Sequence, residues 1–417
     1  MYQQDKEGHF MLRVKIPAGL LQSAQAEELC RLSHKHSNGM LHLTSRGSIE
    51  FHWLEEQNLE PIFAALKEIG LTSRGACGGA VRGISCSTTF APGFAAVQAV
   101  AVKLNRHFAG NPAFEGLPKK FKIGIDAGYE GARHLIQDLG LVLVKDEEGR
   151  CLFDVWCAGG LGKEPQPAFL LEQEVAEESL LHLVESVVQV YRDNTPPPKR
   201  LKTLLNTIGE TEFRRLLQQE LACRPQPSLT GDDDVAPVAS GHFVEVPVFA
   251  GEIKAAQLNQ LAALARKEGS GYLAVTNDQN IALLAEGEQE SEALSRKLRE
   301  TGFFEQPFTF PSRFRVCPGN HECRMGLSPT RDVAASLCKA MPSRLQSESL
   351  AISGCRNSCT QPQLAGYGIV SKKLMTDADG NRVPLFDLYH REGDGLGQCI
   401  AEELSIESLS EAVSRLS

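Results

Sequence analysis

The sequence has no long hydrophobic run: nowhere do eighteen apolar residues follow one another, so we expect no membrane-spanning helix. Aromatic residues are scarce, at 6% of 417 residues, while 42% apolar and 23% charged residues are typical of a globular protein. No G-x-G-x-x-G phrase follows a predicted strand, which argues against a nicotinamide or flavin site. The absence of a C-x2-C-x2-C run argues against an inserted ferredoxin domain.

The net charge of -9 argues against non-specific binding to nucleic acid or to an anionic membrane surface. The first residues carry the charges of Asp5, Lys6 and Glu7 and lack an apolar segment with a small-residue cleavage site, so we expect no signal peptide. Twelve cysteines in such a chain favour a reducing compartment, where they serve as thiols or metal ligands rather than in disulfides. We therefore expect a cytoplasmic enzyme.

One pattern of elements occurs twice in the chain. Residues 11–54 predict a strand, a helix and a strand hairpin, and residues 243–284 predict the same order. The matching positions, with a two-residue length difference, are Val14 with Val244, Pro17 with Pro247, Thr44 with Thr276 and Ile49 with Ile281. A period of about 230 residues indicates two homologous halves rather than a solenoid.

The chain length and the repeat predict several domains. We expect the first repeat in residues 1–72, a first module in 73–200, a helix and linker in 201–240, the second repeat in 241–308, and a second module in 309–417. Proline and aspartate clusters in residues 193–200 and 223–240 indicate exposed connections.

Four cysteines form two pairs on separate predicted loops. Cys317 and Cys323 enclose five residues in RVCPGNHECRMG, and Cys355 and Cys359 enclose three in ISGCRNSCTQP. Two such loops can supply the four thiolates of a [4Fe–4S] cluster. Zinc also accepts four thiolates, but its structural sites usually have two to four residues between paired ligands. The five-residue gap therefore favours the cluster over zinc, and four unpaired thiols are favoured least.

The cysteine spacing, the phrase GCRNSC and the duplication together resemble the siroheme-containing sulfite and nitrite reductases. The resemblance covers nearly the whole chain. It implies an α+β, internally duplicated, pseudo-twofold fold with two related siroheme-binding α/β modules. Residues 1–72 and 241–308 would each form half of a ferredoxin-like domain, 73–200 would bind siroheme and substrate, and 309–417 would bind the cluster and siroheme. It also implies that siroheme and a [4Fe–4S] cluster are the cofactors, that all four cysteines bind the cluster, and that Cys359 also bridges to the siroheme iron as its axial ligand.

The same resemblance assigns roles to four basic residues. Arg13, Arg82, Lys120 and Lys122 match the anion-binding positions of sulfite reductases. There they would hold the oxygens of the substrate and deliver protons as each oxygen leaves as water. Lys122 favours sulfite, because the related assimilatory nitrite reductases tend to carry asparagine at that position.

Arg46 is the residue that we expect to bind siroheme carboxylates, because it matches a Thr-x-Arg phrase of the family. The chain departs from the family pattern nearby, with His42 where arginine is common and Gly47 where glutamine is common. Further arginines around the cysteine loops would contact carboxylates or cap helices: Arg313, Arg315, Arg324, Arg331 and Arg356.

The prediction that follows is the six-electron reduction of sulfite to sulfide. Electrons would pass through the cluster from a separate donor, such as a ferredoxin or a flavoprotein, and neither nucleic acid nor membrane is an expected partner. Three alternatives remain open: reduction of nitrite to ammonia, a precorrin-3B synthase-like reaction, and a non-catalytic metal-binding or electron-transfer module.

Overall fold

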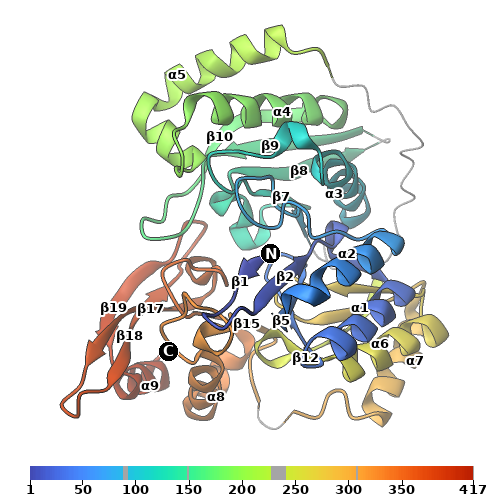
Figure 1. The fold of residues 1–417 in the computed structure, drawn as a ribbon, viewed down its shortest axis with the longest axis vertical. Coiled ribbons are helices and arrows are strands. Elements are labelled where there is room, and N and C mark those ends of the chain that lie inside the picture. The colour runs from blue at the N-terminus through green and yellow to red at the C-terminus, as the bar shows by residue number, and fades with distance from the viewer. Residues whose placement is uncertain (88–92, 148–149, 227–240, 307–308, 417) are drawn as a thin grey trace.

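The computed structural model describes residues 1–87, 93–147, 150–226, 241–306 and 309–416. Three parts meet close to the N-terminus, which lies near the centre of the view in Figure 1. One part is built from both repeats, and the other two are the modules that follow each repeat. Residues 227–240 of the expected second connection lie outside the described residues.

The two repeats contain the same elements in the same order. The first has β1 (Tyr2–Gln3), β2 (Phe10–Val14), β3 (Leu20–Gln22), α1 (Ser23–His36), β4 (Met40–Leu43), β5 (Ile49–Leu54) and α2 (Leu59–Glu68). The second has β11 (His242–Val246), β12 (Glu252–Lys254), α6 (Ala255–Glu268), β13 (Tyr272–Val275), β14 (Ile281–Ala285) and α7 (Glu288–Glu300). Helix α1 buries Ala26, Leu29 and Leu32, because this spacing places all three on one face.

The repeats exchange one short strand each. Strand β12 of the second repeat completes the sheet β1-β2-β5-β4-β12, and β3 of the first repeat completes the sheet β11-β14-β13-β3. Helices α1 and α6 pack against each other, as Figure 1 shows. Each sheet therefore requires both halves of the chain, and the predicted α+β, internally duplicated architecture is confirmed.

The strand register corrects the sequence alignment of the repeats. Val14 pairs with Ile49 between β2 and β5, and Val246 pairs with Ile281 between β11 and β14. Val14 therefore corresponds to Val246, so the predicted match with Val244 was wrong. The alignment followed the similar residues and not the hydrogen-bonded register, which decides equivalence in a sheet.

The turns after these strands agree with the corrected alignment. A short helical turn covers Pro17–Gly19 in the first repeat and Phe249–Gly251 in the second, with left-handed φ angles of 54° at Ala18 and 55° at Ala250. The proline of the second repeat, Pro247, lies two residues before the turn. The predicted two-residue length difference came from matching the two prolines and is absent between these described elements.

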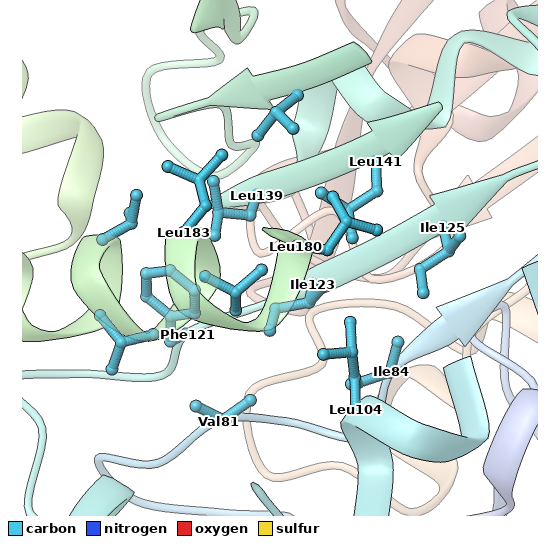
Figure 2. Packing of buried hydrophobic residues seen from close by; sticks show 14 of the residues in the cluster. Val81, Ile84, Leu104, Phe121, Ile123, Ile125, Leu139, Leu141, Leu180 and Leu183 are labelled. Carbon is cyan, nitrogen blue, oxygen red and sulfur yellow. The ribbon is translucent and has the colours of Figure 1, made fainter. Parts of the chain in front are cut away.

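The first module is a sheet of order β10-β9-β8-β7-β6. Its elements are β6 (Ser85–Cys86), α3 (Phe94–Phe108), β7 (Ile123–Asp126), β8 (Leu139–Glu147), β9 (Arg150–Cys157), β10 (Phe169–Ala176), α4 (Glu177–Asn194) and α5 (Leu201–Cys223). Figure 2 shows side chains of these strands packing against Leu180 and Leu183 of α4. Helix α5 lies against α4 on the outside of the module.

The second module repeats this topology. Its elements are β15 (Arg313–Val316), α8 (Thr330–Ala340), β16 (Ser349–Ser353), β17 (Tyr367–Thr376), β18 (Arg382–His390), β19 (Gln398–Leu404) and α9 (Ile406–Arg415). In both modules three parallel strands are followed by two antiparallel ones. Among the described helices, none combines the length and apolar character needed to cross a bilayer.

The strand exchange depends on a close backbone approach at Gly19. This residue has a φ of 74°, and a Cβ there would lie 2.8 Å from the carbonyl oxygen of Val275. Gly70 has a similar φ of 73° but nothing within 4 Å of its Cβ position. Both alanine variants should lose about 1 kcal/mol from the left-handed backbone, and Gly19→Ala should lose a further 1–3 kcal/mol, roughly, from the contact. Thermal melting of both variants tests this, and equal losses would contradict it.

Candidate active site

Parallel pairing of β15 with β16 brings the two cysteine pairs together. Cys317 follows β15 directly, and Cys355 follows β16 after Gly354. The strands run parallel, with Val316 opposite Ile352, so both loops leave the same edge of the sheet. The backbone N–H of Cys317 also donates to the carbonyl oxygen of Ile352 at 3.2 Å.

Glycines allow the two loops to touch. A Cβ on Gly354, in the second cysteine loop, would lie 2.9 Å from the Cα of Gly319 in the first loop. Within the first loop, a Cβ on Gly326 would lie 2.2 Å from the carbonyl carbon of Gly319. The backbone N–H of Gly354 donates to the Sγ of Cys317 at 3.1 Å. Hydrogen bonds to sulfur are among the means by which a protein tunes an iron–sulfur cluster.

The four thiols form one electrostatic group. Burial raises the pKa of Cys317 to about 12, and it also raises the pKa of Cys323 and Cys355. The charge of Cys359 contributes to all three shifts, so each of these thiols lies within electrostatic range of Cys359. Because thiolates are the metal ligands, assembly with iron must release these protons.

The spacing of the thiols fits a cluster better than a zinc ion. A zinc–sulfur bond of about 2.3 Å places tetrahedral thiolates less than about 4 Å apart. In the part of the chain that the structure describes, no three of the thiols lie within 4.8 Å of one another. A sulfur-only donor set on two glycine-packed loops, without three thiols at the distances of a zinc site among the described residues, suits a [4Fe–4S] cluster.

The Cys359 loop is fixed against the first repeat. The Oγ of Ser45 donates to the carbonyl oxygen of Cys359 at 2.9 Å, and the Nε2 of Gln361 donates to the carbonyl oxygen of Ser45 at 3.2 Å. Ser358 and Gln361 have left-handed φ angles of 52° and 59°. Such conformations persist where surrounding contacts enforce them, so this loop is held in one shape.

The first module presents its basic residues just before its parallel strands. Val81 pairs with Phe121 in parallel, and the N–H of Arg82 donates to the carbonyl oxygen of Phe121 at 2.8 Å. Phe121 is buried in the module core, so the side chains on either side of it, Lys120 and Lys122, point away from that core. Arg82 and both lysines therefore lie at one edge of the sheet.

The charges of these residues act on one another. Burial, and then the positive charges of Arg46, Lys120 and Arg200, hold the pKa of Lys122 well below its usual range. Burial also lowers the pKa of Lys120, with Cys359 opposing the shift. The lysines thus lie in the same electrostatic environment as the Cys359 loop.

Carbonyl oxygens hold the guanidinium of Arg82 in place. It donates to the carbonyls of Gly75, Gly78 and Ala80 at 3.1, 2.9 and 3.4 Å, and to the hydroxyl of Tyr2 at 3.4 Å. Burial lowers its pKa. The residues just before β6 and the N-terminal strand together therefore set the position of this side chain.

Arg46 joins the ferredoxin-like part to the first module. Its guanidinium donates to the Oε1 of Gln137 at 2.8 Å and to the carbonyls of Gly83 and Ile123 at 2.9 and 3.0 Å. Burial, and then the charge of Arg13, lower its pKa to about 10. The expected siroheme ligand thus has an additional structural role.

Arg13 forms an ion pair with a buried carboxylate, which the sequence did not indicate. Its Nε and Nη2 donate to the Oε1 of Glu50 at 2.8 and 2.5 Å. Burial alone would raise the pKa of Glu50, but the charge of Arg13 outweighs it and holds that pKa below its usual range. The guanidinium of Arg13, which was predicted to bind the anion, is therefore already paired with a carboxylate of this chain.

Sequence reasoning missed Arg200, whose segment was expected to be an exposed connection. Its side chain is 11% exposed and donates to the two oxygens of Asp138 at 3.1 and 2.6 Å. Asp138 also accepts the backbone N–H of Lys122 at 2.7 Å. No local signal reveals this contact, because Asp138 and Arg200 are 62 positions apart.

Lys15 was also missed, although it lies only two residues after Arg13, just beyond the end of β2. It is 2% exposed, and its Nζ donates to the carbonyl oxygen of Val81 at 3.2 Å. Burial, and then the charge of Arg82, lower its pKa to about 8. Side chains two residues apart on a strand point to the same face, so the spacing from Arg13 would have identified Lys15 as a further basic residue on that face.

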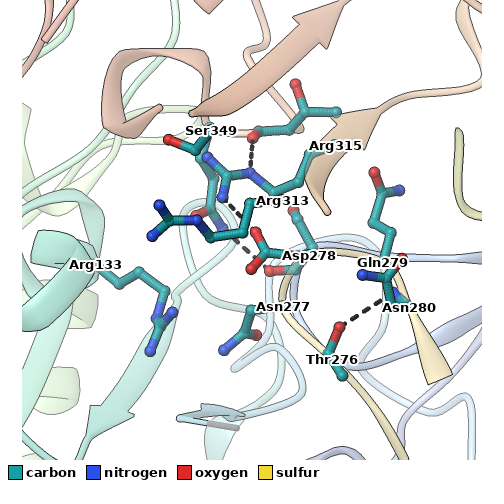
Figure 3. Close-up of polar contacts among 12 residues, drawn as sticks. Arg133, Thr276, Asn277, Asp278, Gln279, Asn280, Arg313, Arg315 and Ser349 are labelled. Atoms are coloured by element: carbon teal, nitrogen blue, oxygen red, sulfur yellow. Dashed lines mark hydrogen bonds and ion pairs between the residues drawn. The ribbon is translucent and has the colours of Figure 1, made fainter. Parts of the chain in front are cut away.

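Two of the arginines near the cysteine loops bind carboxylates of this chain. Arg315 donates to the Oδ1 of Asp278 at 2.8 Å and to the carbonyl of Thr360 at 2.9 Å, as Figure 3 shows. Arg331 donates to Glu252 at 2.9 Å. The buried Nη2 of Arg315 and Nε of Arg331 have no partner among the described residues, which leaves donors for a carboxylate-rich ligand.

Two family models match parts of this chain, and neither matched range includes the four cysteines. Residues 79–225 match the family model described as "Nitrite and sulphite reductase 4Fe-4S domain", and residues 2–69 and 237–301 match the "Nitrite/Sulfite reductase ferredoxin-like half domain". The chain belongs to the nitrite and sulfite reductase family. It is therefore an oxidoreductase, and the cofactors are siroheme and a [4Fe–4S] cluster.

Relatives of both substrate types are similar to this chain. Sulfite reductase [ferredoxin] 2 of Mycolicibacterium paratuberculosis is 27% identical over 94% of this chain and 74% of its own. Ferredoxin–nitrite reductase of Synechococcus elongatus is 27% identical over 92% of this chain and 80% of its own. The structure of the Mycobacterium tuberculosis NirA protein shares the fold, with a TM-score of 0.84, 24% identity, and coverage of 99% of this chain and 82% of that one.

Replacing a cluster cysteine should remove the metal. Cys355→Ser is expected to lose most of its iron and acid-labile sulfide, because a hydroxyl is a poor substitute for a thiolate ligand. Cys399→Ser, at an exposed cysteine in the same module, should keep wild-type levels. Iron and sulfide analysis of both purified variants tests this, and equal iron contents would contradict it.

Lys15 should make stability depend on pH. The unfolded lysine keeps its proton up to its ordinary pKa of 10.5, whereas the folded residue loses it near 8, so the unfolded chain binds more protons between these values. Stability should therefore rise over this window by up to about 3 kcal/mol. The melting-temperature advantage of Lys15→Met over wild type should shrink from pH 7 to about pH 10. Lys119→Met, at an exposed site, is the control; a constant difference for Lys15→Met would contradict the assignment.

Proposed function

We propose that the chain reduces sulfite to sulfide in six electron steps. The observation that carries this proposal is the gathering of Lys120, Lys122 and Arg82 at one sheet edge, in the electrostatic environment of Cys359. A small oxyanion needs such positive groups to bind and to offset charge as electrons are added.

In this proposal each group has a defined role. Cys317, Cys323, Cys355 and Cys359 would hold the cluster, with Cys359 also bridging to the siroheme iron, and Arg46 would bind siroheme carboxylates. The bound cofactors supply electrons to the substrate atom one at a time. Arg13, Arg82, Lys120 and Lys122 would bind the oxygens of the anion. The lowered pKa of both lysines supports a further role in donating protons, because such groups release a proton more readily.

Sulfite is favoured over nitrite by the number of cationic groups. Sulfite bound through sulfur presents three oxygens, whereas nitrite bound through nitrogen presents two. Lys122 provides one more positive charge than the asparagine-bearing relatives have at that position. Nitrite reduction to ammonia is the second candidate, because a ferredoxin–nitrite reductase is as similar to this chain as a sulfite reductase is.

We also propose a ferredoxin as electron donor and a cytoplasmic location. The names of both relatives include ferredoxin, and thiol ligands must remain reduced to bind iron. The division of the chain at residues 72, 200, 240 and 308 also remains our prediction.

Holoenzyme assays with a reduced viologen donor test the substrate. Wild type should form sulfide from sulfite, and Lys122→Asn should lower kcat/KM for sulfite by about tenfold or more, while nitrite turnover falls less. Lys119→Asn, an exposed neighbour, should change neither value.

Two results would count against this proposal. Equal losses for both substrates in Lys122→Asn would remove the role of Lys122 in choosing sulfite. A wild-type holoenzyme that forms ammonia but no sulfide would favour nitrite reductase.

A further inference from the structure

The basic residues around the anion site are less positive as a group than their number suggests. Six cations influence one another there: Arg13, Arg46, Arg82, Lys120, Lys122 and Arg200. Glu50 and Asp138 are buried carboxylates that each bind one arginine through two contacts. Two of the six positive charges are therefore neutralised inside the protein.

Glu50 is the carboxylate that bears directly on substrate binding. It lies in β5, opposite Arg13 of β2 on one side and His42 of β4 on the other. Its side chain is 8% exposed, whereas that of Arg13 is 30% exposed and can still reach an anion. The carboxylate therefore lies one side chain behind an expected anion-binding residue.

The groups that face Glu50 keep it ionised. Arg13 contacts it from β2, the Nε2 of His52 lies 3.5 Å from its Oε2, and His42 lies across from it in β4. Burial lowers the pKa of His42 to about 3, so this histidine is neutral. From the cysteine loop, Cys323 is influenced by the charge of Glu50. Arg13 is the group that stabilises the negative form.

A fixed negative charge behind the binding guanidinium acts differently on different anions. Its repulsion is about twice as large for a dianion as for a monoanion, because Coulomb energy is proportional to charge. Low-dielectric surroundings strengthen this difference. Nitrite is a monoanion, whereas sulfite exists as hydrogensulfite or, at higher pH, as the dianion.

We propose that Glu50 is a specificity-determining residue that offsets the attraction of the remaining cations more for a dianion than for a monoanion, and so favours sulfite in its hydrogensulfite form. This inference rests on the proposed function. Hydrogensulfite also carries into the site one of the protons that oxygen removal consumes. Selection against the dianion thus agrees with the chemistry of the reduction.

Equilibrium binding separates this role from catalysis. The holoenzyme is titrated with sulfite and, separately, with nitrite from about pH 6 to about pH 9, following the siroheme absorption. Nitrite reports how titration of the lysines changes the binding of a monoanion, since its own charge stays constant. In wild type the ratio of the sulfite Kd to the nitrite Kd should rise with pH. In Glu50→Gln the rise should be about tenfold smaller, the size expected for one partly screened charge.

Glu185→Gln is the matched control. The side chain of Glu185 is 8% exposed, as that of Glu50 is, and it also contacts one histidine and one arginine: His107 at 2.5 Å and Arg224 at 3.5 Å. It lies in α4, away from the ferredoxin-like part. This variant should retain the pH dependence of wild type.

Other binding results would overturn either the role of Glu50 or the proposed sulfite reduction. If Glu50→Gln weakens both anions equally and keeps the wild-type pH dependence, Glu50 only orients Arg13 and the proposal is wrong. If that variant does not fold, a pH-independent ratio in wild type would overturn the proposal. If wild-type holoenzyme binds nitrite but not sulfite at any pH, the proposed sulfite reduction fails instead.

Discussion

The parallel pairing of β15 with β16 is the constraint on which the metal centre depends. It directs two cysteine loops, separated by more than thirty residues of chain, to one edge of a sheet. Glycines then allow the loops to approach at backbone distance, and the Ser45 contact fixes the Cys359 loop against the first repeat. A slip in this pairing would separate the thiols, because ligand geometry here follows directly from strand register.

The second constraint is the cost of burying positive charge. Isolated buried cations are unfavourable, so they require carboxylates, carbonyl oxygens or an anionic ligand nearby. Glu50 and Asp138 satisfy two arginines, and carbonyl oxygens surround Arg82 and Arg46. The lysines keep lowered pKa values and no carboxylate contact among those described, which suits residues that bind an anion and exchange protons.

Duplication provided one scaffold twice, and the two copies differ in chemistry. By strand register, Arg46 of the first repeat corresponds to Asp278 of the second. Arg46 binds neutral oxygens of the first module, whereas Asp278 binds Arg315 of the second, as Figure 3 shows. The equivalent turn therefore joins each repeat to its module through a positive side chain in the first repeat and a negative one in the second. The pseudo-symmetric fold thus carries an asymmetric site.

The sequence by itself determined the features that are local or periodic. These include the four cysteines and their spacing and the repeated order of elements, because short-range pattern encodes them. The α+β class followed from the resemblance to the siroheme-containing reductases. Tertiary structure alone decided the strand exchange, the equivalence of Val14 with Val246, and the pairing of Arg13 with Glu50 and of Arg200 with Asp138. Those contacts join positions far apart in the chain, where register and burial, rather than neighbouring residues, decide which charges meet.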